Sequence, residues 1–96
     1  MTLDLTHCWY CNKSISKLSM TIDHFYPKSK GGIRSNKNKI PCCSKCNELK
    51  MDLTPQEFVK VIEVLLHHEV IQHKEKTSYL RRVKGNVTKL IEANKN

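Results

Sequence analysis

The chain has 96 residues, 39% of them hydrophobic and 6% aromatic, and its 17 Lys and Arg side chains give a net charge of +8. A chain this short buries only about two-thirds of its unfolded surface, so we expect one small domain that needs a metal site or another cross-link for stability. These figures exclude a large cofactor enzyme, a dinucleotide-binding fold of ordinary size, and a span of the roughly 18 apolar residues that a bilayer requires.

The five cysteines predict a zinc site. Four of them form two Cys-x-x-Cys pairs, Cys8 with Cys11 and Cys43 with Cys46. Residues 1–5 lack the basic and apolar regions of a signal peptide, so we expect a cytoplasmic protein, in which disulfides are rare. Two such pairs are typical of a tetrahedral zinc site. Cys42 could replace its neighbour as a ligand, but Cys43 keeps the two-residue gap to Cys46.

The segment between the cysteine pairs is predicted to hold two short strands. Residues 18–25 mix β-branched and apolar side chains before Pro27, as a strand does, and a second strand is expected over residues 39–41. A helix is then expected to begin near Ser44 and to continue through residue 50.

The second half of the chain is predicted to be helical. Residues 54–57 read Thr-Pro-Gln-Glu, a capping box with Thr54 as N-cap and Glu57 reaching back. Two sets of apolar residues then recur at helical spacing, separated by a break near residues 73–77: Phe58, Ile62, Leu65, Leu66 and Val70, then Leu80, Val83, Val87, Leu90 and Ile91. We expect two helices, or one kinked helix, whose apolar faces pack on the zinc core or on each other; the alternative is a dimer seam at Val83, Val87 and Leu90.

Three polar side chains indicate metal-assisted hydrolysis. Asp23 and Asn47 offer the oxygen ligands that Mg²⁺ and Mn²⁺ prefer, and neutral His24 can accept a proton from water. A divalent ion held beside His24 could therefore promote attack of water on a phosphodiester. Because neighbouring residues on a strand point to opposite faces, a twist or bulge is needed to bring Asp23 and His24 to one site.

These residues belong to a longer ordered pattern. It runs Asp23-His24, Pro27, Gly31-Gly32, Asn38, Cys43-x-x-Cys46-Asn47 and Lys50. The pattern resembles that of the HNH endonucleases, the ββα-metal nucleases, and the upstream Cys8-Trp9-Tyr10-Cys11 is similar to their zinc-bearing subgroup. The resemblance covers roughly residues 8–58. It implies a ββα-metal (His-Me finger) core with a four-cysteine zinc site over residues 1–58. Residues 59–96 match no known pattern; their predicted helices form a C-terminal extension that packs on the core or mediates association, and the whole is an α+β fold.

The resemblance also implies a role for each site residue. His24 would be the general base, and Asp23 and Asn47 would hold a catalytic Mg²⁺ or Mn²⁺. Asn47 replaces the family's final histidine, which makes this an H-N-N variant. Asn38 would orient the loop, and the histidine through its carbonyl; Asn36 is a nearby competitor, but Asn38 stands five residues before Cys43, as the pattern requires. The structural zinc ligands would be Cys8, Cys11, Cys43 and Cys46.

Positive charge is concentrated around this site. Residues 1–50 carry nine basic and three acidic side chains, whereas residues 51–96 carry eight and six. The basic residues between Lys28 and Lys39 could simply form a solvated loop, but their place beside a phosphodiester site favours contact with the DNA backbone. The expected contacts are Lys28, Lys30, Arg34, Lys37, Lys39 and Lys50. The last of these could instead only solvate the end of its helix.

The resulting hypothesis is a zinc-stabilised, Mg²⁺- or Mn²⁺-dependent endonuclease that hydrolyses DNA with weak or no sequence specificity; a single site makes nicking the elementary event. The alternatives are a non-catalytic zinc module that binds nucleic acid, or an accessory subunit of a larger DNA-processing machine such as a terminase. Double-stranded DNA is the expected partner, with a homodimer possible and no membrane contact. The resemblance suggests the cytoplasm of a bacterial or phage-infected cell.

Overall fold

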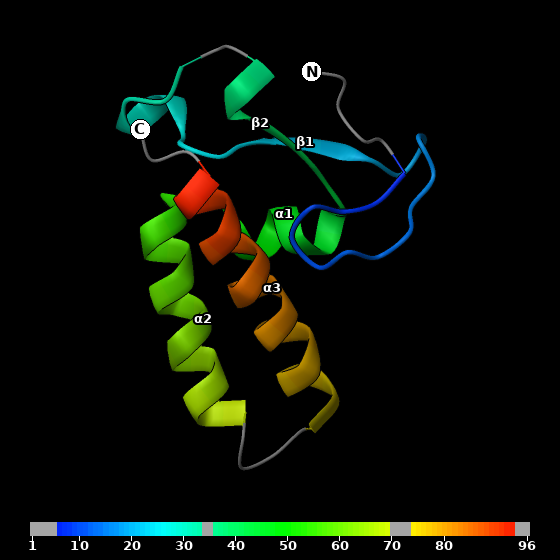
Figure 1. The fold of residues 1–96 in the computed structure, drawn as a ribbon, viewed down its shortest axis with the longest axis vertical. Coiled ribbons are helices and arrows are strands. Elements are labelled where there is room, and N and C mark those ends of the chain that lie inside the picture. The colour runs from blue at the N-terminus through cyan, green and yellow to red at the C-terminus, as the bar shows by residue number, and fades with distance from the viewer. Residues whose placement is uncertain (1–5, 34–35, 70–73, 94–96) are drawn as a thin grey trace.

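The computed structural model describes residues 6–33, 36–69 and 74–93. Its elements, in chain order, are β1 (Thr21–His24), η1 (Lys28–Lys30), η2 (Asn36–Asn38), β2 (Lys39–Cys42), α1 (Ser44–Lys50), α2 (Pro55–Glu69) and α3 (Lys74–Ala93). A two-stranded sheet lies against α1, and α2 and α3 form an antiparallel pair on the α1 side of the sheet (Figure 1). The predicted α+β class, with a ββα core followed by C-terminal helices, is confirmed.

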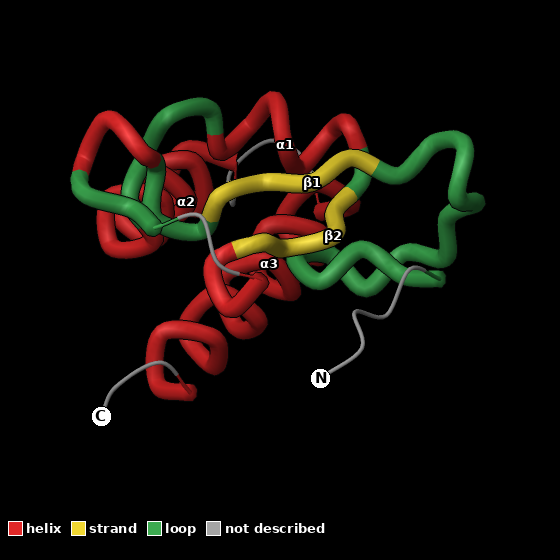
Figure 2. The backbone as a smooth tube through the Cα atoms, turned by 90° about the horizontal axis from the view of Figure 1, so that it is seen from above, coloured by secondary structure: helices red, strands yellow, loops and turns green. Residues whose placement is uncertain are grey.

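The sheet is antiparallel and its register is one-to-one. Asp23 pairs with Ile40 and His24 with Lys39, so the strand contains no bulge. β1 is shorter than the predicted strand over residues 18–25, because its partner ends at Cys42 and Leu18 is fully exposed. Figure 2 shows the two strands side by side, with the loop before β1 extending away from the helices. Asp23 and His24 are therefore the last two residues of β1, where the pairing with β2 ends.

The capping box at the start of α2 forms as predicted. The Thr54 amide donates to Glu57 Oε1 over 2.9 Å, and the Glu57 amide donates to Thr54 Oγ1 over 3.2 Å. The predicted break at residues 73–77 is placed too late, because α3 begins at Lys74 and Thr77 lies within it with its side chain buried. Residues 70–73 lie outside the described part of the chain. No described helix is long and apolar enough to cross a membrane.

One core joins the cysteine-bearing half to the helices. Tyr10 meets Phe58 edge-to-face, with ring centroids 5.7 Å apart, and both side chains are fully buried. Val83 and Val87 of α3 are also fully buried in this cluster. Two members of the stripe considered as a dimer seam are thus used inside the chain, where their burial stabilises the fold.

Candidate active site and metal centre

The four paired cysteines come together in one buried cluster. The sulfurs of Cys8, Cys11, Cys43 and Cys46 all lie within 4.8 Å of one another. Cys11 Sγ and Cys43 Sγ are 3.9 Å apart, close to the roughly 3.8 Å that separates ligands placed tetrahedrally about 2.3 Å from zinc. The donor set and its spacing therefore fit a zinc ion, and the grouping predicted from the sequence is confirmed.

Local turns prepare these sulfurs for a metal. The Cys11 amide points at Cys8 Sγ (3.4 Å) and the Cys46 amide at Cys43 Sγ (3.5 Å). Hydrogen bonding, mainly from Cys46, lowers the pKa of Cys8 and raises that of Cys46, so the two thiols share the proton unequally. Since the thiolate is the form that binds metal, the cluster already favours one ligand in its binding state.

Cys42 lies apart from this cluster. Its sulfur is 3.4 Å from Thr21 Oγ1 across the sheet, and the residue is fully buried. Burial raises the pKa of the Cys42 thiol to about 12. The cluster thus contains Cys43 and not Cys42, in agreement with the two-residue gap between Cys43 and Cys46.

Helix α3 directly contacts the turns that carry the four clustered cysteines. Tyr79 Oη lies 3.0 Å from Cys46 Sγ, and Arg82 Nε donates to the Cys11 carbonyl over 3.1 Å. Asn86 Nδ2 donates to the Tyr10 carbonyl over 2.8 Å. The sequence analysis assigned none of these three contacts; the only signal for them was the spacing of three and four residues, which puts the three side chains on one helix face.

Asp23 is held in a buried charged network. Its Oδ2 accepts from Tyr10 Oη over 2.6 Å and from Lys50 Nζ over 2.8 Å. The Lys50 ammonium also donates to the His24 carbonyl over 3.1 Å, and its side chain has no exposed area. Burial, together with the charge of Asp23, raises the pKa of Tyr10, which keeps its hydroxyl protonated and able to donate. No local pattern in the sequence assigns this contact to Tyr10.

Asp23 and His24 nevertheless open onto one hollow. It measures about 470 Å³ and is also lined by Lys28, Met51 and Asp52. A twist or bulge was expected to bring Asp23 and His24 to one site. The strand has no bulge; His24 is instead the last residue of β1 and lies at the strand end. Asp52, a second carboxylate at this hollow, was not predicted; it accepts a hydrogen bond from Ser29.

The contacts of the Asp23 carboxylate within the described chain fall on Oδ2, so Oδ1 is the oxygen left to meet a cation. Asn47 lies on α1, half-buried, one turn before Met51, whose amide donates to the Asn47 carbonyl. Asn47 is not among the residues lining the hollow. Asp23 and Asp52 both offer carboxylate oxygens to this hollow, the kind of donor that Mg²⁺ and Mn²⁺ prefer.

Asn38 fastens the loop that follows β1. Its Oδ1 accepts from the Tyr26 amide (2.8 Å), and its Nδ2 donates to the carbonyls of Tyr26 (2.9 Å) and Ile33 (2.8 Å). The Asn38 carbonyl accepts from the Phe25 amide, one residue after His24. Asn38 therefore holds the backbone next to His24 in place through its hydrogen bonds to Phe25 and Tyr26.

The six expected phosphate contacts are placed differently from one another. Lys28 lines the hollow of Asp23 and His24. Lys30 pairs with Glu57 at 2.8 Å, Lys37 is exposed beside a separate hollow near the two glycines, and Lys39 is half-buried.

Lys50 requires a correction, and Arg34 lies outside the described residues. Neither interpretation of Lys50, as a phosphate contact or as a solvated helix end, agrees with its position. Its ammonium is buried on Asp23 and on a backbone carbonyl. Pairing with a buried carboxylate offsets the cost of removing this charge from water.

Comparison with known families agrees with this geometry. A family model described as HNH endonuclease matches residues 8–63, more than half of the chain. The fold and the site thus define a small α+β domain with a buried four-cysteine cluster that fits a zinc ion, and the chain belongs to the HNH endonuclease family. The match extends past the expected boundary at residue 58 to residue 63, further along α2. A comparison with curated proteins found no match.

Proposed function

We propose that this protein is a zinc-stabilised, divalent-metal-dependent endonuclease that hydrolyses phosphodiester bonds of double-stranded DNA, one strand at a time. The observation that carries the proposal is the shared hollow of Asp23 and His24 in a chain of the HNH endonuclease family. The expected metals are zinc in the cysteine cluster and Mg²⁺ or Mn²⁺ at Asp23.

In this proposal the chain's own residues divide the work. His24 takes the proton from the attacking water. Tyr10 and Lys50 fix one oxygen of Asp23, so that its other oxygen is presented in a single orientation to the catalytic ion. Asn47 would complete the protein ligands from α1. When bound, the divalent ion supplies stabilisation of charge on the phosphate and on the departing 3′ oxygen.

Lys28 is the side chain best placed to meet the substrate at this hollow, since it lines the same space as His24. Its ammonium would neutralise part of the phosphate charge, in the manner of a backbone contact that carries no sequence information. We therefore expect cleavage with little sequence preference.

One observation favours a second function. Asp23 is already paired with Lys50 and Tyr10, and a buried ammonium next to a metal ligand opposes a second cation. If that pairing excludes the divalent ion, the chain is a zinc-dependent nucleic-acid-binding module without catalysis, or an accessory subunit of a larger DNA-processing assembly.

A supercoiled-plasmid assay separates the two. Wild type is compared with His24→Ala in Mg²⁺ and in Mn²⁺, and the zinc content of each protein is measured. His68→Ala is the matched control, because His68 is exposed near the end of α2. The nuclease predicts open-circle product from wild type and from the control, with loss of cutting in His24→Ala at unchanged zinc content.

Two results would count against the nuclease. If zinc-loaded wild type leaves the plasmid supercoiled with either metal but still binds it, the binding module is favoured. If His24→Ala cuts as fast as wild type, the general base has been assigned to the wrong residue.

A further inference from the structure

We propose that a second hollow, between the zinc-binding turns and α3, binds backbone phosphates of the DNA strand beside the cleavage site. The proposal rests on the nuclease function proposed above and adds a substrate subsite to it. It involves residues of the C-terminal helix beyond the part of the chain that the family model matches.

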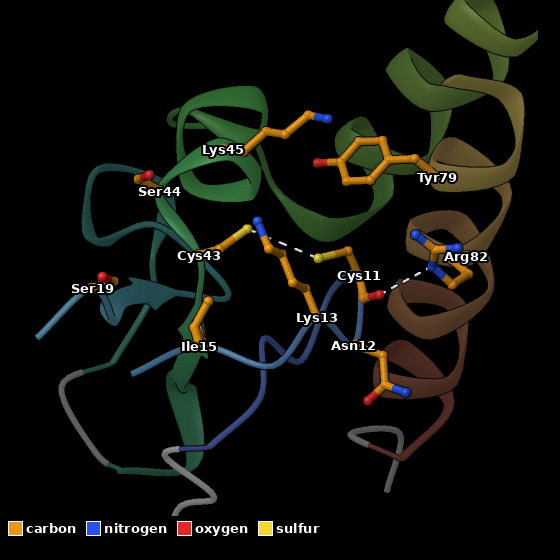
Figure 3. Close-up of a pocket in the computed structure, with 10 residues that line it drawn as sticks. All are labelled: Cys11, Asn12, Lys13, Ile15, Ser19, Cys43, Ser44, Lys45, Tyr79 and Arg82. Carbon is orange, nitrogen blue, oxygen red and sulfur yellow. Dashed lines mark hydrogen bonds between the residues drawn. The ribbon is translucent and has the colours of Figure 1, made fainter. Parts of the chain in front are cut away.

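The hollow measures about 670 Å³, and Figure 3 shows its side chains. The lining residues are Cys11, Asn12, Lys13, Ile15, Ser19, Cys43, Ser44, Lys45, Tyr79 and Arg82. Three of them are cations, and none of these ten residues is a carboxylate. The space therefore offers donors and positive charge to an anion.

The three cations come from separate parts of the chain and face the same space (Figure 3). Lys45 Nζ lies 4.1 Å from the centre of the Tyr79 ring, which stabilises its position through a cation–π contact. Arg82 is anchored through Nε to the Cys11 carbonyl, which leaves the amino groups of its planar fork for a phosphate. Lys13 follows the first zinc-binding turn and is exposed.

Charge balance supports an anion rather than a cation as the occupant. Four thiolates around one zinc ion carry a net charge of −2, whereas Lys13, Lys45 and Arg82 carry three positive charges. The zinc-loaded hollow thus keeps a net positive charge. The Asp23 hollow is lined by two carboxylates and one lysine, and Lys50 pairs with Asp23, so in the absence of a divalent ion it offers a phosphate less favourable charge than the zinc side.

Helix α1 connects the two hollows. Ser44 lines the zinc-side hollow and Met51, just past the last residue of α1, lines the Asp23 hollow. Asn47 lies between them on the same helix face, at the spacing of three and four residues. A seven-residue helix is about 10 Å long, which corresponds to about three nucleotides of one strand along the axis of a duplex. One strand can therefore reach both hollows.

The competing explanation is that these cations only balance the charge of the zinc tetrathiolate. The two explanations differ in what the cations affect. A phosphate subsite controls DNA affinity and its dependence on salt, whereas a charge-balancing role controls how firmly zinc is held.

The test compares two double variants that remove the same charge. Lys13→Gln with Lys45→Gln empties the hollow of two cations, and Lys60→Gln with Lys89→Gln removes two exposed cations outside it. Fluorescence anisotropy with a short labelled duplex is measured on zinc-loaded protein, without Mg²⁺ or Mn²⁺, over a series of salt concentrations. Replacing Lys13 and Lys45 should make the slope of log K against log salt less steep by about 1.8, and replacing Lys60 and Lys89 should change it by much less.

Equal salt slopes for the two double variants would overturn the subsite. It would also be overturned if the Lys13/Lys45 double variant bound DNA as tightly as wild type but lost zinc faster to a chelator. Plasmid nicking by wild type distinguishes failure of the subsite from failure of the nuclease. If wild type nicks DNA while the slopes agree, only the subsite fails. If wild type neither binds nor cuts DNA, the nuclease fails and the subsite fails with it.

Discussion

Replacing Lys50 with methionine tests the buried network that holds Asp23. Methionine fills nearly the same volume as the lysine stem but removes the ammonium. The Asp23 carboxylate would then keep only the Tyr10 hydroxyl as its partner on Oδ2, in a place where 8% of its side chain is exposed. An uncompensated charge at such a site is costly, because water cannot replace the lost partner.

The expected loss is about 3–5 kcal/mol, the usual effect of removing one partner of a buried ion pair. For a domain of this size each kcal/mol lowers Tm by roughly 4–8 °C, so the lower estimate already corresponds to a drop of about 12 °C. Replacing both partners, Asp23→Asn with Lys50→Met, leaves no unpaired charge. The double variant should therefore recover most of the loss.

Thermal unfolding of zinc-loaded proteins, followed by circular dichroism, gives the four corners of this double-mutant cycle. Lys30→Met is the matched control, because its ammonium pairs with Glu57 at an exposed site, where 37% of the Lys30 side chain is accessible. That change should cost no more than about 1 kcal/mol. A Lys50→Met protein as stable as the control, or a double variant no better than the single one, would refute the idea of a buried, coupled pair.

Other substitutions test the metal cluster and the loop after β1. Cys42→Ala should retain one zinc per chain and Cys43→Ala should not, as metal analysis of the purified proteins will show; the reverse result would place the wrong cysteine in the cluster. Tyr79→Phe removes the hydroxyl that contacts a zinc ligand and should lower zinc affinity about 10–100-fold in a chelator competition, whereas Tyr26→Phe should leave it unchanged. Asn38→Ala deletes three hydrogen bonds of a buried side chain and should cost about 2–4 kcal/mol in urea unfolding; a loss below about 1 kcal/mol would mean that the loop is held by other contacts.

Local features of the sequence were enough to predict much of this protein. The two Cys-x-x-Cys pairs identified the four-cysteine cluster, because a two-residue gap already directs both sulfurs to one side of a turn. The capping box set the start of α2 for the same reason, since its two hydrogen bonds join residues three apart. The Asp23-His24 pair could also be placed close to the end of a predicted strand.

Contacts between distant residues could not be predicted in this way. Lys50 was expected at a phosphate or in solvent, and its burial became visible only when α1 packed against β1 and brought it to Asp23. A lysine near the end of an amphipathic helix carries no local signal that separates an exposed ammonium from a paired one, because the partner comes from another element.

The C-terminal helix shows the same division most clearly. Its apolar spacing determined that it is a helix with a buried face, and this follows from the 3.6-residue period alone. The part of the protein against which α3 packs depends on the tertiary structure. Arg82 donates a hydrogen bond to the carbonyl of Cys11, 71 residues earlier in the chain, and Asn86 donates one to the carbonyl of Tyr10, 76 residues earlier. The sequence by itself therefore determined the grouping of the cysteines and the helices, while the tertiary structure decided that α3 supports the turns that carry those cysteines, because hydrogen bonds over such separations exist only once the chain has folded.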